Sequence, residues 1–275
     1  MKLYDLLGQV ISVFSKNGSS DHAKSLSYKE ESLRDVVTQL DRQLHATAEE
    51  FLRANLPQTL LISEENFRAT FPLRAIIDED SSLLVDPVDG SNNLVLGLKE
   101  FGFMASLISQ GTFQESIVVL PTYNFFIHWS LEDGLFVPRQ LNRHFHDSAT
   151  IYLAYASSLS SKSSNLRSEL LSHADTASSG VYRYGSSCVG LYHCLTGAHS
   201  NFVGLELRHW DVLPFFPVLD SLGAEIAYRF DEDRISCIVS FQHNLHLKLL
   251  NILENDLGNF HAFNPALRLI LQDQA

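Results

Sequence analysis

Residues 83–93 read LLVDPVDGSNN and join a short apolar run to a compact acidic turn. The apolar run predicts a buried strand that ends at Asp86. Pro87 cannot donate to a strand ladder and Asp89-Gly90 is a strong turn signal, so we expect the chain to reverse between Asp86 and Asp89. Such a reversal would bring both carboxylates toward one point. Taken alone, the segment is also compatible with an ordinary turn.

The residues after this turn add groups that bind an anion. Ser91 or Asn92 can cap a following helix, whose free backbone N–H groups would face the same point as the carboxylates. Carboxylates that bind hard cations, next to amides that bind an anion, are typical of a metal-assisted phosphate site.

The charge balance limits the partners of the protein. Its 275 residues include 32 Asp and Glu against 20 Lys and Arg, a formal net charge of −12 at pH 7. Nucleic acids and anionic membranes are bound by surplus Lys and Arg, so neither is expected as a partner. An acidic chain that handles phosphate needs another positive group, and a bound metal is the obvious candidate. The 45% hydrophobic content indicates a globular protein with a sizeable core.

Cysteine usage and the amino-terminal pattern predict a cytoplasmic protein. The three cysteines form no CxxC pair and leave an odd thiol, which indicates a reducing compartment. Residues 3–14 carry the apolar stripe of an amphipathic helix, interrupted by Asp5 and followed by no small-residue cleavage site, so we do not expect a signal peptide. No apolar run reaches the roughly 18 residues of a membrane span.

Helical and strand-like patterns alternate along the chain. Further helices are expected near residues 33–51, 166–173, 189–196, 213–222 and 244–254. Strands are expected at 59–62, 75–77, 83–85, 103–108, 116–120, 125–129, 201–207, 224–228 and 235–240. Segments 16–29 and 157–165 read as loops, and the polar segment 139–148 marks a soft boundary between residues 1–147 and 148–275. The alternation predicts a mixed α/β protein built in layers, as one large domain or two intimately packed ones.

Three further acidic positions lie at the ends or edges of these elements. Asp41 falls at the edge of the apolar stripe of the second helix, next to the core. Glu64-Glu65 follows a short apolar strand, and Asp211 stands at the apparent start of a helix. Each has an ordinary interpretation as well: a solvated helix flank, an exposed acidic turn and a helix N-cap.

Together these segments resemble the inositol monophosphatase family of lithium-sensitive, Mg²⁺-dependent phosphatases. The motif Asp-Pro-x-Asp-Gly-Ser-x-Asn stands at residues 86–93, and Val-Thr-x-x-Asp stands at 37–41. The paired glutamates are Glu64-Glu65, the later Gly-Ser-Ser turn is 185–187, and the Trp-Asp motif is 210–211. Their order and spacing agree over nearly the whole chain, so the resemblance is more specific than any one motif.

The resemblance implies a layered αβαβα sandwich with the active site between its two halves, and it implies two magnesium ions. Glu64, Asp86 and the backbone carbonyl of Val88 would hold one Mg²⁺. Asp86, Asp89 and Asp211 would hold the second, so that Asp86 bridges both ions.

The resemblance also implies roles in catalysis and binding. Asp41 and Ser91 would orient or activate the attacking water, with Glu64 assisting. The remaining implied contacts to phosphate or substrate come from Asp89, Gly90, Ser91, Ser187 and Glu206. The implied activity is hydrolysis of a small polyol or sugar phosphate, with no covalent intermediate, by a protein that forms a homodimer.

Two departures from the family pattern concern the segment around Trp210-Asp211. The family usually continues with small residues, whereas Pro217 here should kink or shorten the following helix. Some members place an acidic residue before this motif to bind a sugar hydroxyl. The aligned position is Gly204, with Glu206 two residues later, so inositol recognition is the less secure part of the resemblance.

Other functions stay open at this point. Within the superfamily these are a 3′(2′),5′-bisphosphate nucleotidase, a fructose-1,6-bisphosphatase and a histidinol phosphatase. A non-catalytic metal- or phosphosugar-binding relative is another, because Pro217 could distort the second metal site. His144 with His146, and His243 with His246, have no convincing third ligand nearby for zinc. Serine-hydrolase, P-loop and dinucleotide-binding fingerprints are absent from the sequence.

Overall fold

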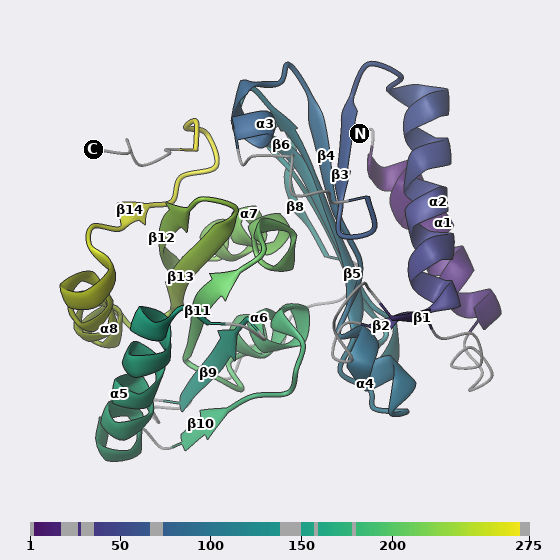
Figure 1. Ribbon diagram of the computed structural model, residues 1–275. Coiled ribbons are helices and arrows are strands. Elements are labelled where there is room, and N and C mark those ends of the chain that lie inside the picture. Colours follow the sequence, from purple (N-terminus) through teal and green to yellow (C-terminus); the bar gives the residue numbers. More distant parts are fainter. Residues whose placement is uncertain are drawn as a thin grey trace.

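The structure is a computed structural model that describes residues 3–17, 27–28, 36–66, 74–137, 150–156, 159–177 and 180–269. Two six-stranded sheets alternate with three layers of helices, in the order helix, sheet, helix, sheet, helix (Figure 1). The layered αβαβα sandwich expected from the sequence is thereby confirmed.

The first sheet has the strand order β3-β4-β5-β6-β7-β8. Its strands are β3 (Leu60–Ser63), β4 (Ser82–Asp89), β5 (Gly102–Ser109), β6 (Thr112–Leu120), β7 (Phe125–Ser130) and β8 (Gly134–Phe136). Only β3 and β4 run parallel, and the other neighbours are antiparallel. Helices α1 (Leu3–Asn17) and α2 (Gln39–Asn55) cover its outer face, while α3 (Arg74–Asp78) and α4 (Ser91–Val95) are short connections. A separate pair, β1 (Ser27–Tyr28) and β2 (Val36–Val37), precedes α2.

The second sheet has the order β10-β9-β11-β13-β12-β14. Its strands are β9 (Thr150–Tyr155), β10 (Gly180–Tyr182), β11 (Asn201–Leu207), β12 (Glu225–Asp231), β13 (Arg234–Ser240) and β14 (His261–Ala262). Helices α5 (Ser161–Ala177) and α8 (His243–Leu257) cover its outer face. The middle layer contains α6 (Ser187–Thr196), α7 (Phe216–Asp220) and the 3₁₀ turns η3 (His209–Asp211) and η4 (Leu213–Phe215). A further turn, η2 (Pro121–Tyr123), joins β6 to β7.

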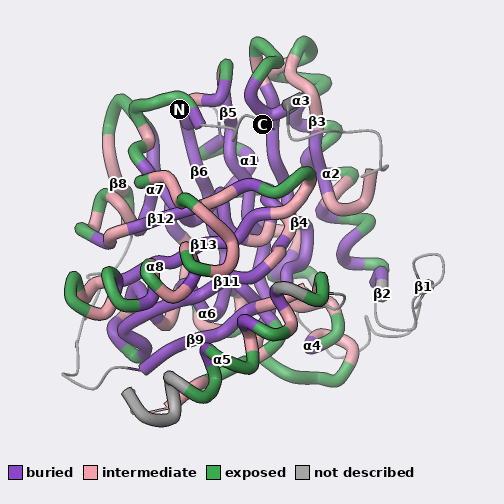
Figure 2. Tube along the Cα trace, turned by 60° about the vertical axis from the view of Figure 1, so that its left-hand side comes forward, coloured by how far each residue is buried: buried purple, intermediate pink, exposed green. Residues whose placement is uncertain are grey.

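The two sheets share the hydrophobic core of the middle layer, and each has a further cluster on its outer face. Strand β4 is buried along its whole length: Leu83 and Val85 pack toward α1 and α2, while Leu84 packs into the middle layer. The middle cluster combines side chains of both halves, such as Trp129 of β7 and Phe202 of β11. Figure 2 shows this burial as nearly continuous purple along the central strands. Because both strand faces are covered, these strands read as continuous apolar runs instead of alternating ones.

Three sequence-based predictions of secondary structure were wrong. The second helix begins at Gln39, because Thr38 caps it and Val37 belongs to β2. The predicted strand at 75–77 is part of helix α3; a short apolar run does not distinguish a strand from a buried helical turn. Helix α5 begins at Ser161, so the serine-rich segment predicted as a loop is partly helical.

Strand β4 also continues further than expected. It runs through Pro87 to Asp89, and its register against β5 shifts between Asp86 and Asp89. An irregular step of this kind accommodates a proline that cannot donate to the ladder. The predicted reversal between Asp86 and Asp89 is therefore wrong, and the chain turns only at Gly90, which has a φ of 89°.

Two segments that were expected to be a loop and a domain boundary lie partly or wholly outside the described residues. The expected loop at 16–29 overlaps α1 and β1, and its residues 18–26 and 29 lie outside the described part of the chain. The boundary segment 139–148, with His144 and His146, also lies outside it.

The expected effect of Pro217 is confirmed: segment 213–222 divides into η4 and the five-residue α7, with Pro217 in its first turn. None of the described helices is long and apolar enough to cross a membrane.

Candidate active site

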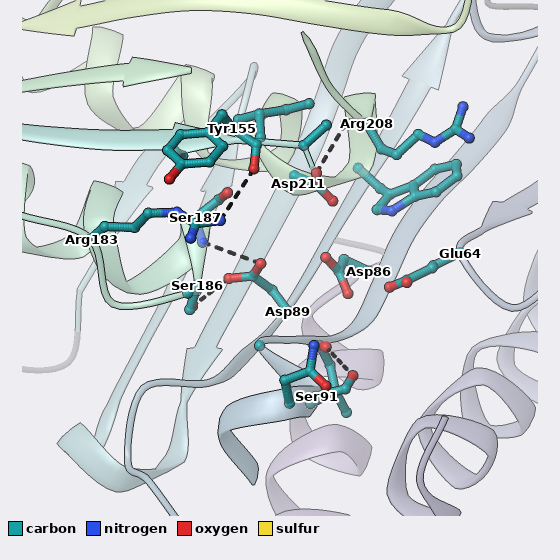
Figure 3. Close-up of a pocket in the computed structure, with 18 of the residues that line it drawn as sticks. Glu64, Asp86, Asp89, Ser91, Tyr155, Arg183, Ser186, Ser187, Arg208 and Asp211 are labelled. Carbon is teal, nitrogen blue, oxygen red and sulfur yellow. Dashed lines mark hydrogen bonds between the residues drawn. The ribbon is translucent and has the colours of Figure 1, made fainter. Parts of the chain in front are cut away.

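A cavity of about 400 Å³ lies where the end of β4 meets the second sheet. Figure 3 shows acidic side chains from both halves pointing toward a common centre. Four of the predicted metal ligands, Glu64, Asp86, Asp89 and Asp211, line this cavity, together with Val88. The structure therefore brings together the acidic residues that the sequence motifs singled out, although they come from separate segments.

Asp86 is the most deeply buried of these carboxylates. Its exposed fraction is 1%, and its Oδ1 has no hydrogen-bond partner. Burial, followed by the negative charges of Glu64 and Asp89, raises the pKa of Asp86 well above its ordinary value. A buried carboxylate oxygen without a donor is destabilising, and a hard cation is a ligand that would satisfy it.

Asp89 connects the first half to the second. Its carboxylate accepts hydrogen bonds from the Ser186 hydroxyl, from the Ser187 backbone N–H at 3.2 Å and from the Cys188 backbone N–H at 2.7 Å. These donors form the first turn of α6, where a negative charge is favourable. Burial raises the pKa of Asp89 to about 6 even though the three hydrogen bonds lower it. Ser186 lies within the predicted Gly-Ser-Ser turn, but its bond to Asp89 was not anticipated.

Gly90 permits the sharp turn after β4. Its φ of 89° favours glycine, and a Cβ at this position would lie 2.6 Å from the carbonyl oxygen of Glu100. Helix α4 begins directly afterwards at Ser91. The close approach fixes Ser91 and Gly90 against the cavity that Asp86 and Asp89 border.

Asp41 and Ser91 form the pair that the resemblance implied. The Ser91 hydroxyl donates to Asp41 Oδ1 at 2.7 Å, and the Val88 carbonyl oxygen lies 2.8 Å from the same hydroxyl. The other oxygen of Asp41 accepts the Thr38 backbone N–H at 2.8 Å and the Thr38 hydroxyl. Asp41 is thus held in the capping box of α2, where it is buried and oriented toward Ser91.

Glu64 and Asp211 reach the cavity from different halves of the chain. The Glu64 backbone N–H donates to the Val85 carbonyl at 3.3 Å, so Glu64 follows directly on the pairing of β3 with β4. Asp211 ends η3 and accepts the Arg208 backbone N–H at 2.9 Å. Burial, then the charges of Asp89 and Glu64, raise the pKa of Asp211 well above its ordinary value.

The donor set fits a magnesium ion that keeps several water ligands. In the described residues, no three acidic, histidine or cysteine side chains already form a closed metal cage. Mg²⁺ commonly binds through one or two carboxylates and completes its shell with water and phosphate oxygens, so it does not require such a cage. The unpartnered oxygen of Asp86 and the raised pKa values of Asp86 and Asp211 are the signs of a site that lacks positive charge.

Glu206 does not lie with the other predicted site residues. It does not line the cavity; its carboxylate accepts the Ser160 backbone N–H at 2.8 Å and the Ser163 hydroxyl at 2.5 Å. The aligned position Gly204 cannot replace it, because a Cβ there would lie 2.7 Å from a Leu207 methyl carbon. Neither position offers a carboxylate to a substrate in the cavity.

The cavity wall also contains residues that sequence reasoning missed. Arg183, Arg208, Arg234 and Tyr155 line it, and all four come from the second half. Two of them stand two residues before a recognised motif: Arg183 before Gly185, and Arg208 before Trp210. Their proximity to these motifs is the feature of the sequence that could have indicated a place in the site.

The described histidine pair, His243 and His246, lies away from the cavity. His243 lies in α8, with its Nδ1 2.7 Å from a carboxylate oxygen of Glu225, and neither His243 nor His246 lines the cavity. Ser187, in contrast, does line it, at the start of α6 and next to Asp89.

Comparisons with known proteins agree with this architecture. A model of the inositol monophosphatase family matches residues 3–255. The extragenic suppressor protein SuhB from Bartonella henselae is similar in structure, with a TM-score of 0.76, 18% identity and coverage of 94% of this chain and 100% of that chain. An IMPase from Thermotoga maritima has a TM-score of 0.70, 17% identity and coverage of 91% and 96%.

A third similar structure is an IMPase/NADP phosphatase complexed with Mg²⁺ and phosphate. Its TM-score is 0.71 at 17% identity, with coverage of 95% of this chain and 97% of that chain. At these identities the similarity concerns the fold. The sequences of curated proteins give no significant match.

Proposed function

The chain belongs to the inositol monophosphatase family, and from this membership we propose that it is a Mg²⁺-dependent phosphomonoesterase acting on a small polyol or sugar phosphate. The observation that carries the proposal is the buried, unpartnered oxygen of Asp86 among three other carboxylates, beside the Asp41–Ser91 pair. The magnesium complex of the related IMPase/NADP phosphatase supports the choice of metal.

In this proposal two magnesium ions share the acidic end of the cavity. Glu64, Asp86 and the Val88 carbonyl would hold one ion, and Asp86, Asp89 and Asp211 would hold the second. When bound, such ions neutralise the phosphate, lower the pKa of a nearby water and stabilise charge on the leaving oxygen.

The residues of the chain itself would orient the attacking water. The Ser91 hydroxyl, fixed by its donation to Asp41, presents its oxygen to a water in the cavity and can accept one of its protons. Asp41 can take the Ser91 proton in turn, since its Oδ1 already accepts that hydrogen bond. Thr38 prevents the Asp41 carboxylate from rotating away, because it donates twice to the opposite oxygen.

Phosphate would lie between the two halves. Gly90 and Ser91 line the cavity from the first half and Ser187 lines it from the second, so a phosphate among them would contact both. Glu64 would assist proton movement on the same side as Ser91. For in-line attack, the alcohol portion would have to lie on the side of the phosphorus atom opposite the water that Ser91 orients.

Asp211 favours a catalytic protein over a non-catalytic binding relative. Pro217 shortens α7, but Asp211 precedes that helix and still lines the cavity. The shortened helix therefore leaves all the proposed carboxylate ligands available. The homodimer implied by the family resemblance stays a prediction, which the sedimentation velocity of the purified protein would test.

Phosphate release from a panel of monoesters tests the proposal. We expect the purified protein to release inorganic phosphate with Mg²⁺ and to lose that activity with EDTA. Asp86→Asn should lose nearly all activity on every substrate of the panel. Absence of Mg²⁺-dependent release, or full activity of Asp86→Asn, would contradict the proposed function.

A further inference from the structure

The second sheet contains a buried tyrosine that lines the cavity. Tyr152 lies in β9, beside Tyr182 of β10 and Phe202 of β11, and its exposed fraction is only 1%. Its ring stacks on the Phe202 ring, with 5.5 Å between the ring centroids. A hydroxyl at such a depth is destabilising unless it is hydrogen-bonded, so its partners indicate what it does.

The hydroxyl of Tyr152 is bonded to three backbone groups of a single turn. It donates to the Ser186 carbonyl oxygen at 2.7 Å, and it accepts the N–H groups of Tyr184 at 3.1 Å and Ser186 at 3.4 Å. Burial raises the pKa of Tyr152 above its ordinary value, so the hydroxyl keeps the proton that it donates. One side chain thus holds both ends of the segment 184–186, which lies between β10 and α6.

Residues at the end of this turn hold the carboxylate of Asp89. The Ser186 hydroxyl donates to it, as do the backbone N–H groups of Ser187 at 3.2 Å and Cys188 at 2.7 Å. Figure 3 shows the Asp89 carboxylate directed toward Ser186 and Ser187. Because these donors follow directly on the backbone that Tyr152 holds, a displacement of the turn would move them together.

The first half of the chain holds the same turn from its other side. The side-chain amide of Asn93, which is buried in α4, donates to the carbonyl oxygens of Tyr184 and Glu100, both at 2.7 Å. Tyr184 is therefore held at its carbonyl oxygen by Asn93 and at its N–H by Tyr152. The turn has one anchor in each half of the chain.

Helix α6 packs against the ring of the same tyrosine. A Cβ at Gly190 of α6 would lie 2.4 Å from two carbon atoms of the Tyr152 ring, so a glycine is required where the helix backbone meets the ring. The Ser186 carbonyl oxygen accepts the Gly190 N–H at 3.2 Å as well as the Tyr152 hydroxyl. Tyr152 therefore contacts both the turn and the first turn of the helix that follows it.

We propose that Tyr152 is a positioning residue for the metal ligand Asp89: its hydroxyl holds the 184–186 turn so that the donors at the start of α6 orient the Asp89 carboxylate. This inference rests on the proposed phosphatase function and adds to it a residue that acts through the turn. Without the hydroxyl, Asp89 would keep its charge but lose its fixed orientation, so a metal would bind less tightly. Groups that orient a metal ligand typically contribute about 10- to 100-fold to metal affinity.

The Mg²⁺ affinity of the full-length protein tests the inference. Tyr152→Phe removes the hydroxyl and keeps the stacked ring, so we expect the Mg²⁺ dissociation constant measured by calorimetric titration to rise about tenfold. Because the substitution acts through metal affinity, the kcat of Tyr152→Phe should return to nearly the wild-type value at saturating Mg²⁺.

Tyr228 provides the matched control. It lies in β12 of the same sheet, is buried and does not line the cavity. Tyr228→Phe also removes the hydroxyl of a buried tyrosine, and it should leave the Mg²⁺ dissociation constant unchanged. An equal rise in both variants would indicate a general loosening of the sheet and overturn the inference.

Asn93→Ala removes the other anchor of the turn and keeps the inference testable if Tyr152→Phe does not fold. It should raise the Mg²⁺ dissociation constant in the same direction. If either folded variant binds Mg²⁺ as tightly as the wild type, or if the kcat of Tyr152→Phe stays low at saturating Mg²⁺, the positioning role fails and the phosphatase function stands. If the wild type hydrolyses no phosphate monoester, the proposed function itself is contradicted, whatever the titration shows.

Discussion

The two walls of the cavity are built in different ways. The acidic residues Glu64, Asp86 and Asp89 follow from paired strands: Ser63 pairs with Val85, and each carboxylate stands within four residues of that pair. The arginines of the other wall have long side chains at the ends of separate strands and are partly or fully exposed. Short side chains on a buried backbone keep a fixed geometry, whereas long ones at a cavity mouth can adapt. The first wall therefore keeps its carboxylates in a fixed arrangement, whereas the second can change shape at the mouth of the cavity.

The largest effect should follow from removing the central carboxylate of the acidic wall. Asp86→Asn is expected to lower kcat/KM on the order of a thousandfold, because one group that stabilises charge in the transition state often contributes this much. The metal-free variant should melt at the same temperature as the metal-free wild type or higher, since a buried carboxyl with a raised pKa is replaced by a neutral amide. Mg²⁺ should no longer raise its melting temperature.

Asp80→Asn is the control for this substitution. Asp80 is exposed just before β4 and does not line the cavity, so the same chemical change should leave both activity and the Mg²⁺-induced shift intact. A metal-induced shift in Asp86→Asn as large as in the wild type would refute the role of Asp86 as a ligand.

The next effect concerns the Asp41–Ser91 pair. Ser91→Ala removes the hydroxyl that links Asp41 to the cavity and should reduce kcat by about a hundredfold, as expected for lost general acid–base assistance. Steady-state kinetics would measure it. Ser106→Ala is the control. It removes a buried hydroxyl of the first sheet, 2.6 Å from the Ser116 hydroxyl and away from the cavity, and should retain kcat. Equal losses in both variants would indicate a structural effect only.

A smaller effect is expected from pH. Burial raises the folded-state pKa of Asp89 to about 6, above its ordinary 3.8, so this carboxyl binds a proton more tightly in the folded metal-free protein than in the unfolded chain. Its contribution favours the folded metal-free state at low pH and is lost as pH rises from about 4 to 6. Magnesium requires the ionised form, so its affinity should fall about tenfold between pH 7 and pH 5. Calorimetric titration with Mg²⁺ would show this, and a constant affinity would exclude Asp89 as a ligand.

The smallest catalytic effect should come from a substitution at Gly204 in β11, outside the cavity. Gly204→Ala places a Cβ 2.7 Å from a Leu207 methyl carbon and 2.9 Å from Cys237 Sγ, so it should destabilise the protein by about 1–3 kcal/mol. Its activity per folded molecule should change little, because Gly204 does not line the cavity. Gly8→Ala, at an exposed position of α1 with no atom within 4 Å of the new Cβ, should instead stabilise by about 0.5–1 kcal/mol. Urea unfolding compares the two, and an unchanged stability of Gly204→Ala would contradict the steric explanation.

The acidic residues that line the cavity could be predicted from the sequence because they stand in compact motifs. Asp86 and Asp89 are separated by two positions, so any local geometry keeps them near each other, and the family resemblance supplied Glu64 and Asp211. The local conformation was harder to predict: the strand tolerates Pro87 only because its register shifts there, which depends on β5.

The arginines that line the other side of the cavity could not be predicted from the sequence in the same way. Arg183, Arg208 and Arg234 converge because β9 pairs with both β10 and β11, and β11 with β13. That order of strands is a property of the folded sheet, and no spacing in the sequence reveals it. Glu206 was misplaced for a related reason: with a φ of 50°, at an irregularity of β11, its carboxylate is directed to the start of α5.

The shared core between the sheets determines how molecules enter and leave. Side chains of both halves, such as Trp129 and Phe202, belong to one packed cluster behind the cavity. Well-packed interiors resist gradual deformation, so a hinge that separates the sheets would have to disrupt this cluster. Entry to the cavity would then depend on exposed side chains that line it, such as Arg183, and not on separation of the sheets.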